Sequence, residues 1–148
     1  MAVAITFAPI MANIKKVHTR MLSDYEWEAA NAQGNKVRID MYPDDAKEHQ
    51  SPMDLLLSAV TSCAAVDLVQ MLKKRRRQVV GLEIDAEGTR QETEPKYFHT
   101  INMHFTLNSP DASEEEMEKY TKMAVEKYCS VASSLQSELV VTSSVVRS

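Results

Sequence analysis

The longest apolar run in this sequence is SPMDLLLSAVTSCAAVDLVQMLKKRRR, which extends from Ser51 to Arg77. Ser51 is a favourable N-cap, and proline, here Pro52, is favoured in the first turn of a helix. The five cations at 73–77 suit the negative end of a helix dipole. Apolar residues surround the predicted helix on almost every side, which is typical of a helix buried in a core. We therefore predict one long core helix.

A membrane span is the alternative interpretation of this run. Polar side chains interrupt the run too often for a span: Asp54, Ser58, Thr61, Ser62, Asp67 and Gln70. We therefore expect a soluble core helix and no membrane partner.

The composition is that of a folded globular protein. The chain has 148 residues, 44% of them hydrophobic, which is enough to bury one core without metals or disulfides. The formal net charge of −4 disfavours a dedicated nucleic-acid binder. We interpret the cations at 73–77 as a solvated helix end and expect no nucleic-acid partner. The two cysteines do not indicate a disulfide scaffold, so a reducing cytoplasm is the expected location.

We predict a single domain over residues 13–148, preceded by an N-terminal arm at residues 1–12. The arm is apolar but too short to cross a bilayer. Three interpretations stay open: a loose arm, an added strand, or residues that precede a start at Met11.

The remaining segments alternate between strand and helix patterns. Period-2 alternation and short polar turns predict five strands, at 14–22, 25–31, 36–42, 79–91 and 97–107. Ser113 and Glu116 form a capping box that starts an amphipathic helix. A further helical turn or two and a last strand at 138–146 follow. The predicted order is βββ-α-ββ-α-β, an α+β fold in which helices pack against a sheet.

Two thiols are the main candidates for chemistry. From the residues alone, Cys63 is interpreted as a small core hydrophobe, because burial raises a thiol pKa and makes the thiol inert. Cys129 falls at a predicted helix break, where Ser130 could cap the next turn and N–H groups could favour a thiolate. The histidines lack metal-ligand spacing and no glycine-rich phosphate loop is present, so we expect no metal and no cofactor.

Three segments, matched in order, resemble the OsmC/Ohr family of thiol peroxidases. They are the run at 51–77, PKYFHTINMHFTL at 95–107 and AVEKYCSVASSL at 124–135, and the likeness covers about residues 35–142. The sequence is more similar to the OsmC-like branch than to the organic-hydroperoxide-resistance branch.

The resemblance implies an intertwined homodimer, in which six-stranded antiparallel sheets wrap around two long central helices and the active sites lie at the subunit interface. It implies that Cys63 is the thiol that attacks the peroxide and that Cys129 is the resolving thiol, with a Cys63–Cys129 disulfide between them. The substrate would be an organic hydroperoxide, and the function a defence against oxidative stress. An external dithiol, lipoyl-based in the hydroperoxide-resistance members, would reduce the disulfide.

The sequence departs from the family in the residues around the attacking thiol. The family places a glutamate directly after the proline that begins the helix, and an arginine from an N-terminal strand pairs with it. Here Met53 follows the proline, so Asp54 and Glu48 are the candidate acids. Arg20 and Arg38 are the candidate cations.

The alternative hypothesis is a protein that binds a small apolar or thiol-containing molecule at the dimer interface with little or no turnover. Met53, Met71 and Met103 would suit such an adaptable pocket.

Overall fold

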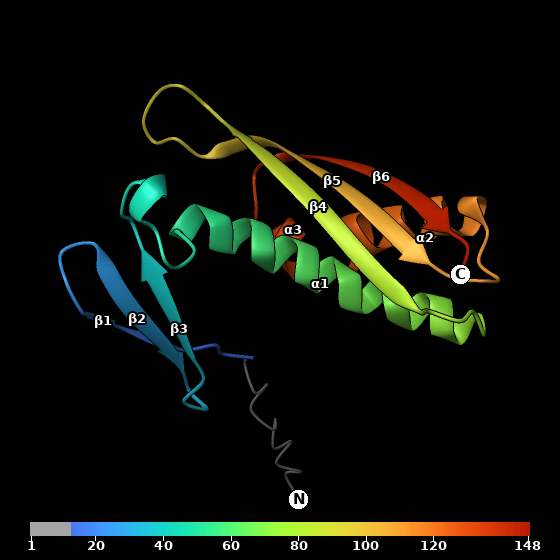
Figure 1. Cartoon of the computed structure of the whole chain (residues 1–148), viewed down its shortest axis with the longest axis horizontal. Helices are drawn as coiled ribbons and strands as arrows, with labels where there is room; N and C mark the ends of the chain where they lie inside the picture. Colours follow the sequence, from blue (N-terminus) through green and yellow to red (C-terminus); the bar gives the residue numbers. More distant parts are fainter. Residues whose placement is uncertain (1–12) are drawn as a thin grey trace, which may run out of the picture. The chain divides into compact units, whose positions relative to one another are not determined.

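The computed structural model of the chain describes residues 13–148 (Figure 1). Its internal contacts divide it into two compact units, which are the chain up to Pro52 (unit 1) and Met53–Ser148 (unit 2). That residues 13–148 act as one domain stays a prediction, and the arm predicted at 1–12 lies outside the described residues.

Unit 1 is a three-stranded antiparallel meander in the order β1-β2-β3. Its strands are β1 (Val17–Met21), β2 (Glu26–Asn31) and β3 (Lys36–Asp40), followed by the short helix η1 (Asp44–Ala46). Each strand lies within a predicted range, and the predicted hairpin pairing is confirmed.

Asp40 organises the loop that follows the meander. Its carboxylate is almost completely buried and accepts backbone N–H groups from Tyr42, Glu48 and His49. Burial alone would raise the pKa of Asp40, yet these three donors hold that pKa below its ordinary value. The charged side chain thus fixes the loop that leads toward the first residue of the long helix.

Unit 2 combines a three-stranded sheet with helices, in the order β4-β5-β6 across the sheet. Its elements are α1 (Pro52–Lys74), β4 (Gly81–Arg90), β5 (Phe98–Asn108), α2 (Glu114–Met123), the π-helix η2 (Ala124–Tyr128), α3 (Ser130–Ser133) and β6 (Glu138–Val146). The predicted order βββ-α-ββ-α-β is confirmed, and the further helical turns predicted after the second helix are present as η2 and α3.

The predicted antiparallel pairing is wrong for the last strand. β4 and β5 are antiparallel, but β6 pairs with β5 in parallel. The helices between β5 and β6 return the chain to the end of the sheet where β5 begins, which is how parallel neighbours are connected. The described strands form two three-stranded sheets in this chain, and the six-stranded sheets that the resemblance implies for a homodimer stay a prediction.

The core of unit 2 lies between one face of this sheet and its helices. Figure 1 shows α1, α2 and α3 on the same side of β4–β6. Alternate residues of β5 are fully or nearly fully buried, namely Ile101, Met103, Phe105 and Leu107. They pack with the buried residues of α1, namely Val60, Ala64, Leu68 and Leu72.

The prediction that α1 is buried on all sides is wrong within this chain. Its buried residues recur every four positions and form one stripe, whereas Val66, on another face, is 62% exposed. By length and composition α1 would also pass as a membrane span, a test that core helices of soluble proteins pass as well. The apolar residues outside the stripe therefore need another explanation than packing within unit 2.

A Schellman-type cap ends α1. The N–H of Arg77 donates to the carbonyl of Leu72, and the N–H of Arg76 donates to that of Lys73. Arg76 occupies the left-handed region with a φ of 59°. This conformation is usual for glycine at such a position and is unfavourable for a residue with a Cβ atom.

A substitution of Arg76→Gly is expected to raise the free energy of unfolding by roughly 0.5–1 kcal/mol, because it removes the left-handed strain. The matched change Lys73→Gly, inside α1, is expected to lower that free energy by about 1 kcal/mol. Urea denaturation of both variants measures the difference. Loss of stability in both variants would contradict the assignment of strain to Arg76.

Candidate functional site

Cys63 lies in the middle of α1, at the edge of the buried stripe. It precedes the fully buried Ala64, and its own side chain is partly buried and packs against the core of unit 2. Cys63 therefore packs against the core while the residue stays partly exposed. A thiol in this position is more accessible than the core hydrophobe expected from the residues alone.

Cys129 lies at the break between the π-helix and α3. Its N–H donates to the carbonyl of Ala124 at 2.8 Å, and its backbone then turns to an extended conformation. The sulfur accepts the N–H of Ala132 at 3.3 Å, so Cys129 caps α3. The prediction that Ser130 provides this cap is therefore wrong, because Ser130 is already the first residue of α3.

The structure brings the two thiols together from distant parts of unit 2. Cys129 is completely buried, its sulfur lies 3.8 Å from the carbonyl oxygen of Val60, and both cysteines are free. Burial raises the pKa of the Cys129 thiol, and the side chain of Cys63 raises it further. The N–H that Ala132 donates to the sulfur lowers this pKa and offsets part of the rise. Cys129 is therefore a protonated thiol at neutral pH, close enough to Cys63 for that side chain to raise its pKa.

The candidate cations belong to unit 1, where each is already paired. Arg20 contacts Glu28 at 2.8 Å, and Arg38 contacts Glu26 at 2.9 Å. Hydrogen bonds from Arg20 and a neighbouring lysine lower the pKa of the Glu28 carboxyl.

The candidate acids lie on either side of the start of α1. Glu48 is exposed and donates its backbone N–H to Asp40 at 2.9 Å. Asp54 is exposed in the first turn of α1. Their roles near the thiols, like those of Arg20 and Arg38, stay predictions.

Sequence reasoning missed a cavity beside the second half of α1. It has a volume of about 330 Å³, and one wall is formed by Asp67, Gln70, Met71 and Lys74. These positions follow the i, i+3, i+4, i+7 spacing of a single helix face, a signal that was present in the sequence. Of the methionines suggested for a pocket, Met71 lines this cavity, while Met103 is buried in the core. Met53 packs against that core.

No group of three or more histidine, cysteine or acidic side chains within residues 13–148 has an arrangement that could hold a metal ion. The arrangement of unit 2 is thus that of a thiol pair, with a partly polar cavity along the same helix.

Known proteins resemble this chain over most of its length. The family described as OsmC-like protein matches residues 42–144. Protein YhfA of Escherichia coli (strain K12) is 33% identical over 114 residues, which are 77% of this chain and 84% of that protein. A crystal structure of a hypothetical protein from Aquifex aeolicus VF5 matches with a TM-score of 0.80 and 26% identity. The match covers 91% of this chain and 98% of the chain in that structure.

A more distant structure shares the fold alone. The organic hydroperoxide resistance protein OhrB of Bacillus subtilis matches with a TM-score of 0.60 and 17% identity. The match covers 90% of this chain and 98% of the OhrB chain.

The raised pKa of Cys129 predicts a particular dependence of stability on pH. In the unfolded chain this thiol has its ordinary pKa, so as the pH rises it loses its proton at a lower pH than in the folded protein. This loss of the proton stabilises the unfolded state and therefore favours unfolding. The stabilisation is therefore complete below the ordinary thiol pKa and is lost as the pH rises toward the raised value in the folded protein. Urea denaturation from about pH 7 to about pH 10, under reducing conditions, measures the loss.

The control is Cys129→Ala, which is expected to be less stable at every pH because it removes a buried sulfur. Its stability should fall less steeply between these pH values, because the contribution of the raised thiol pKa is absent from the variant. Equal slopes would contradict the assignment of a raised pKa to this thiol.

Proposed function

The chain belongs to the OsmC-like protein family, and on that premise we propose that it is a cysteine-dependent peroxidase that reduces organic hydroperoxides in defence against oxidative stress. The main support is that unit 2 holds two free cysteines close together, with the Cys63 side chain raising the pKa of the buried Cys129 thiol. The name of OhrB, which shares the fold, is consistent with a hydroperoxide as the substrate.

In the proposed reaction the thiolate of Cys63 attacks an oxygen of the hydroperoxide. A sulfur–oxygen bond forms, the oxygen–oxygen bond breaks, and the alkoxide leaves and takes a proton to become an alcohol. Cys63 is thereby oxidised to a sulfenic acid. Its partly exposed position makes it the better candidate for this attack, because Cys129 has no exposed surface.

Cys129 resolves the sulfenic acid in the second step. A disulfide forms between Cys63 and Cys129, and the hydroxyl of the sulfenic acid leaves as water with the proton of the Cys129 thiol. The raised pKa of Cys129 keeps that proton on the sulfur until this step. An external dithiol, of the lipoyl type, then reduces the disulfide by thiol–disulfide exchange.

The proposed assembly is a homodimer in a reducing cytoplasm, with no nucleic-acid or membrane partner. The apolar residues that α1 leaves outside its buried stripe support a second copy as the cover, since Val66 and Leu56 are 62% and 36% exposed in the single chain. Glu48 and Asp54 remain the candidate acids, and Arg20 and Arg38 the candidate cations, for activation of Cys63.

A second candidate function is the binding of a small apolar or thiol-containing ligand, at the interface of the dimer, with little turnover. One feature of the sequence favours it, which is Met53 in place of the glutamate that the family has after the helix-starting proline. A thiol without a nearby cation is a weaker nucleophile at neutral pH.

Stoichiometric cumene hydroperoxide separates the two functions. The wild-type protein is expected to lose two hydrogens in its intact mass, through the disulfide between Cys63 and Cys129. Cys63→Ser should abolish the reaction. Cys129→Ser should instead accumulate a sulfenic acid on Cys63 that dimedone traps, because no resolving thiol is present. A wild-type protein that remains fully reduced under peroxide would contradict the peroxidase and favour the binding function.

A further inference from the structure

The lining of the cavity in unit 2 combines cationic and apolar side chains. It is formed by the second half of α1, the residue that follows it, α2 and the π-helix. Its lining consists of Asp67, Gln70, Met71, Lys74, Arg75, Tyr120, Met123 and Tyr128. Its volume of about 330 Å³ falls in the range of small-molecule sites.

The cations in the lining are Lys74 and Arg75. Within residues 13–148 neither side chain has a hydrogen-bond or ion-pair partner, whereas the nearby Arg77 contacts Glu116 at 2.8 Å. One carboxylate, that of Asp67, is also in the lining, so the walls have an excess of positive charge. Two unpaired cations in the lining of a concavity can bind an anionic group.

The apolar part of the lining consists of two methionines and two tyrosines. Met71 and Met123 are partly buried and pack against the core, and Tyr120 is 7% exposed. Methionine side chains are flexible and polarisable, so they adapt to ligands of different shape. These apolar side chains therefore favour a ligand that has an apolar group next to its anionic group.

We propose that this cavity binds an organic anion with an apolar body, its carboxylate or phosphate head on Lys74 and Arg75 and its body against Met71 and Met123. The site is distinct from the thiol pair but adjoins it along the chain. Asp67 lies one helical turn after Cys63 in α1, and Tyr128 directly precedes Cys129. Binding requires neither thiol, so the proposal stands or falls independently of peroxidase activity.

Isothermal titration calorimetry with octanoate, octyl phosphate and 1-octanol tests the required chemistry. We expect both anions to bind to the reduced wild-type protein and to Cys63→Ser alike, and the alcohol to bind at least about tenfold more weakly. The alcohol has the same chain but no charge for Lys74 and Arg75 to contact. Failure of both anions to bind would overturn the proposal.

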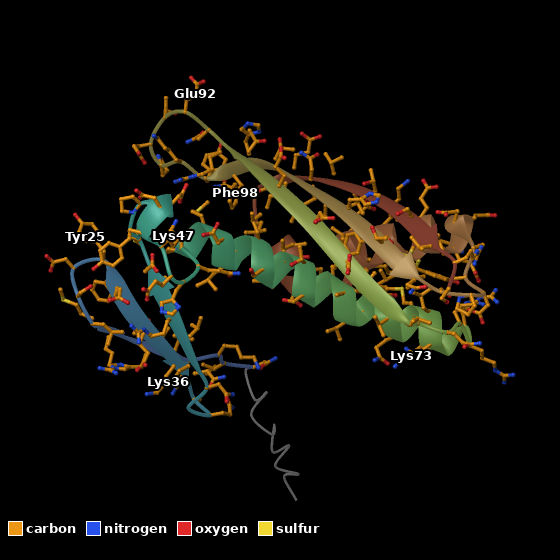
Figure 2. The ribbon with its side chains drawn as sticks, in the orientation of Figure 1. Tyr25, Lys36, Lys47, Lys73, Glu92 and Phe98 are labelled. Atoms are coloured by element: carbon orange, nitrogen blue, oxygen red, sulfur yellow. The ribbon has the colours of Figure 1, made fainter. Side chains whose placement is uncertain are left out.

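The cation run provides a matched charge control. The double variant Lys74→Ala/Arg75→Ala should weaken octanoate binding about tenfold or more. Lys73→Ala/Arg76→Gly removes the same charge from residues that do not line the cavity, and it should change the affinity less than about twofold. Figure 2 shows Lys73 at the end of α1. Equal losses in the two variants would overturn the proposal in favour of diffuse surface charge.

The location of the anion is tested by filling the cavity and by spectroscopy. Met123→Trp is expected to abolish octanoate binding while the far-ultraviolet circular dichroism stays that of the wild type. Octanoate should also shift the methyl resonances of Met71 and Met123 in methionine-labelled protein, and leave that of the core residue Met103 in place. Binding to phosphatidylglycerol vesicles without binding of octanoate, or shifts confined to other methionines, would overturn the assignment.

Discussion

The packing of one face of α1 against the inward face of β5 is the constraint on which the rest of unit 2 depends. The four buried residues of α1 recur every fourth position, slightly more than one turn of 3.6 residues, so the stripe winds slowly around the helix. Full burial of each larger side chain stabilises the fold by about 1.5–3 kcal/mol. This stripe fixes the rotation of α1, and the rotation places Cys63 at its edge and the Val60 carbonyl over Cys129.

The thiol pair depends equally on a local irregularity in the second helix. An uninterrupted α-helix through residues 124–133 would give the Cys129 sulfur no role as a cap. The π-helix ends with the bond from Cys129 to Ala124, and the extended backbone that follows lets the sulfur accept the N–H of Ala132. π-helical turns are frequent at functional sites, and here the turn positions a buried thiol against a partly exposed one.

The five cations that follow one another in the sequence have different structural roles. Arg77 forms an ion pair with Glu116, which also completes the capping box of α2 and so ties the end of α1 to the start of α2. Arg76 accepts an unfavourable φ to close the helix cap. Lys74 and Arg75 reach the cavity. In the sequence these cations resemble a uniform solvated helix end. In the structure they have different roles, because the backbone presents each side chain in a different direction.

The sequence by itself determined the order of the elements, the extents of most strands and the start of both long helices, because these follow from local periodicity and capping. The pairing of Cys63 with Cys129 as the candidate site came from the resemblance to the OsmC/Ohr family, since the residues alone indicated a core hydrophobe at Cys63. Only the tertiary structure decided the parallel pairing of β6 and the single buried stripe of α1. The same holds for the approach of the Cys129 thiol to Cys63 and for the cavity at Met71 and Met123. These features depend on which distant segments meet, and the sequence pattern of one segment does not contain the position of its neighbour.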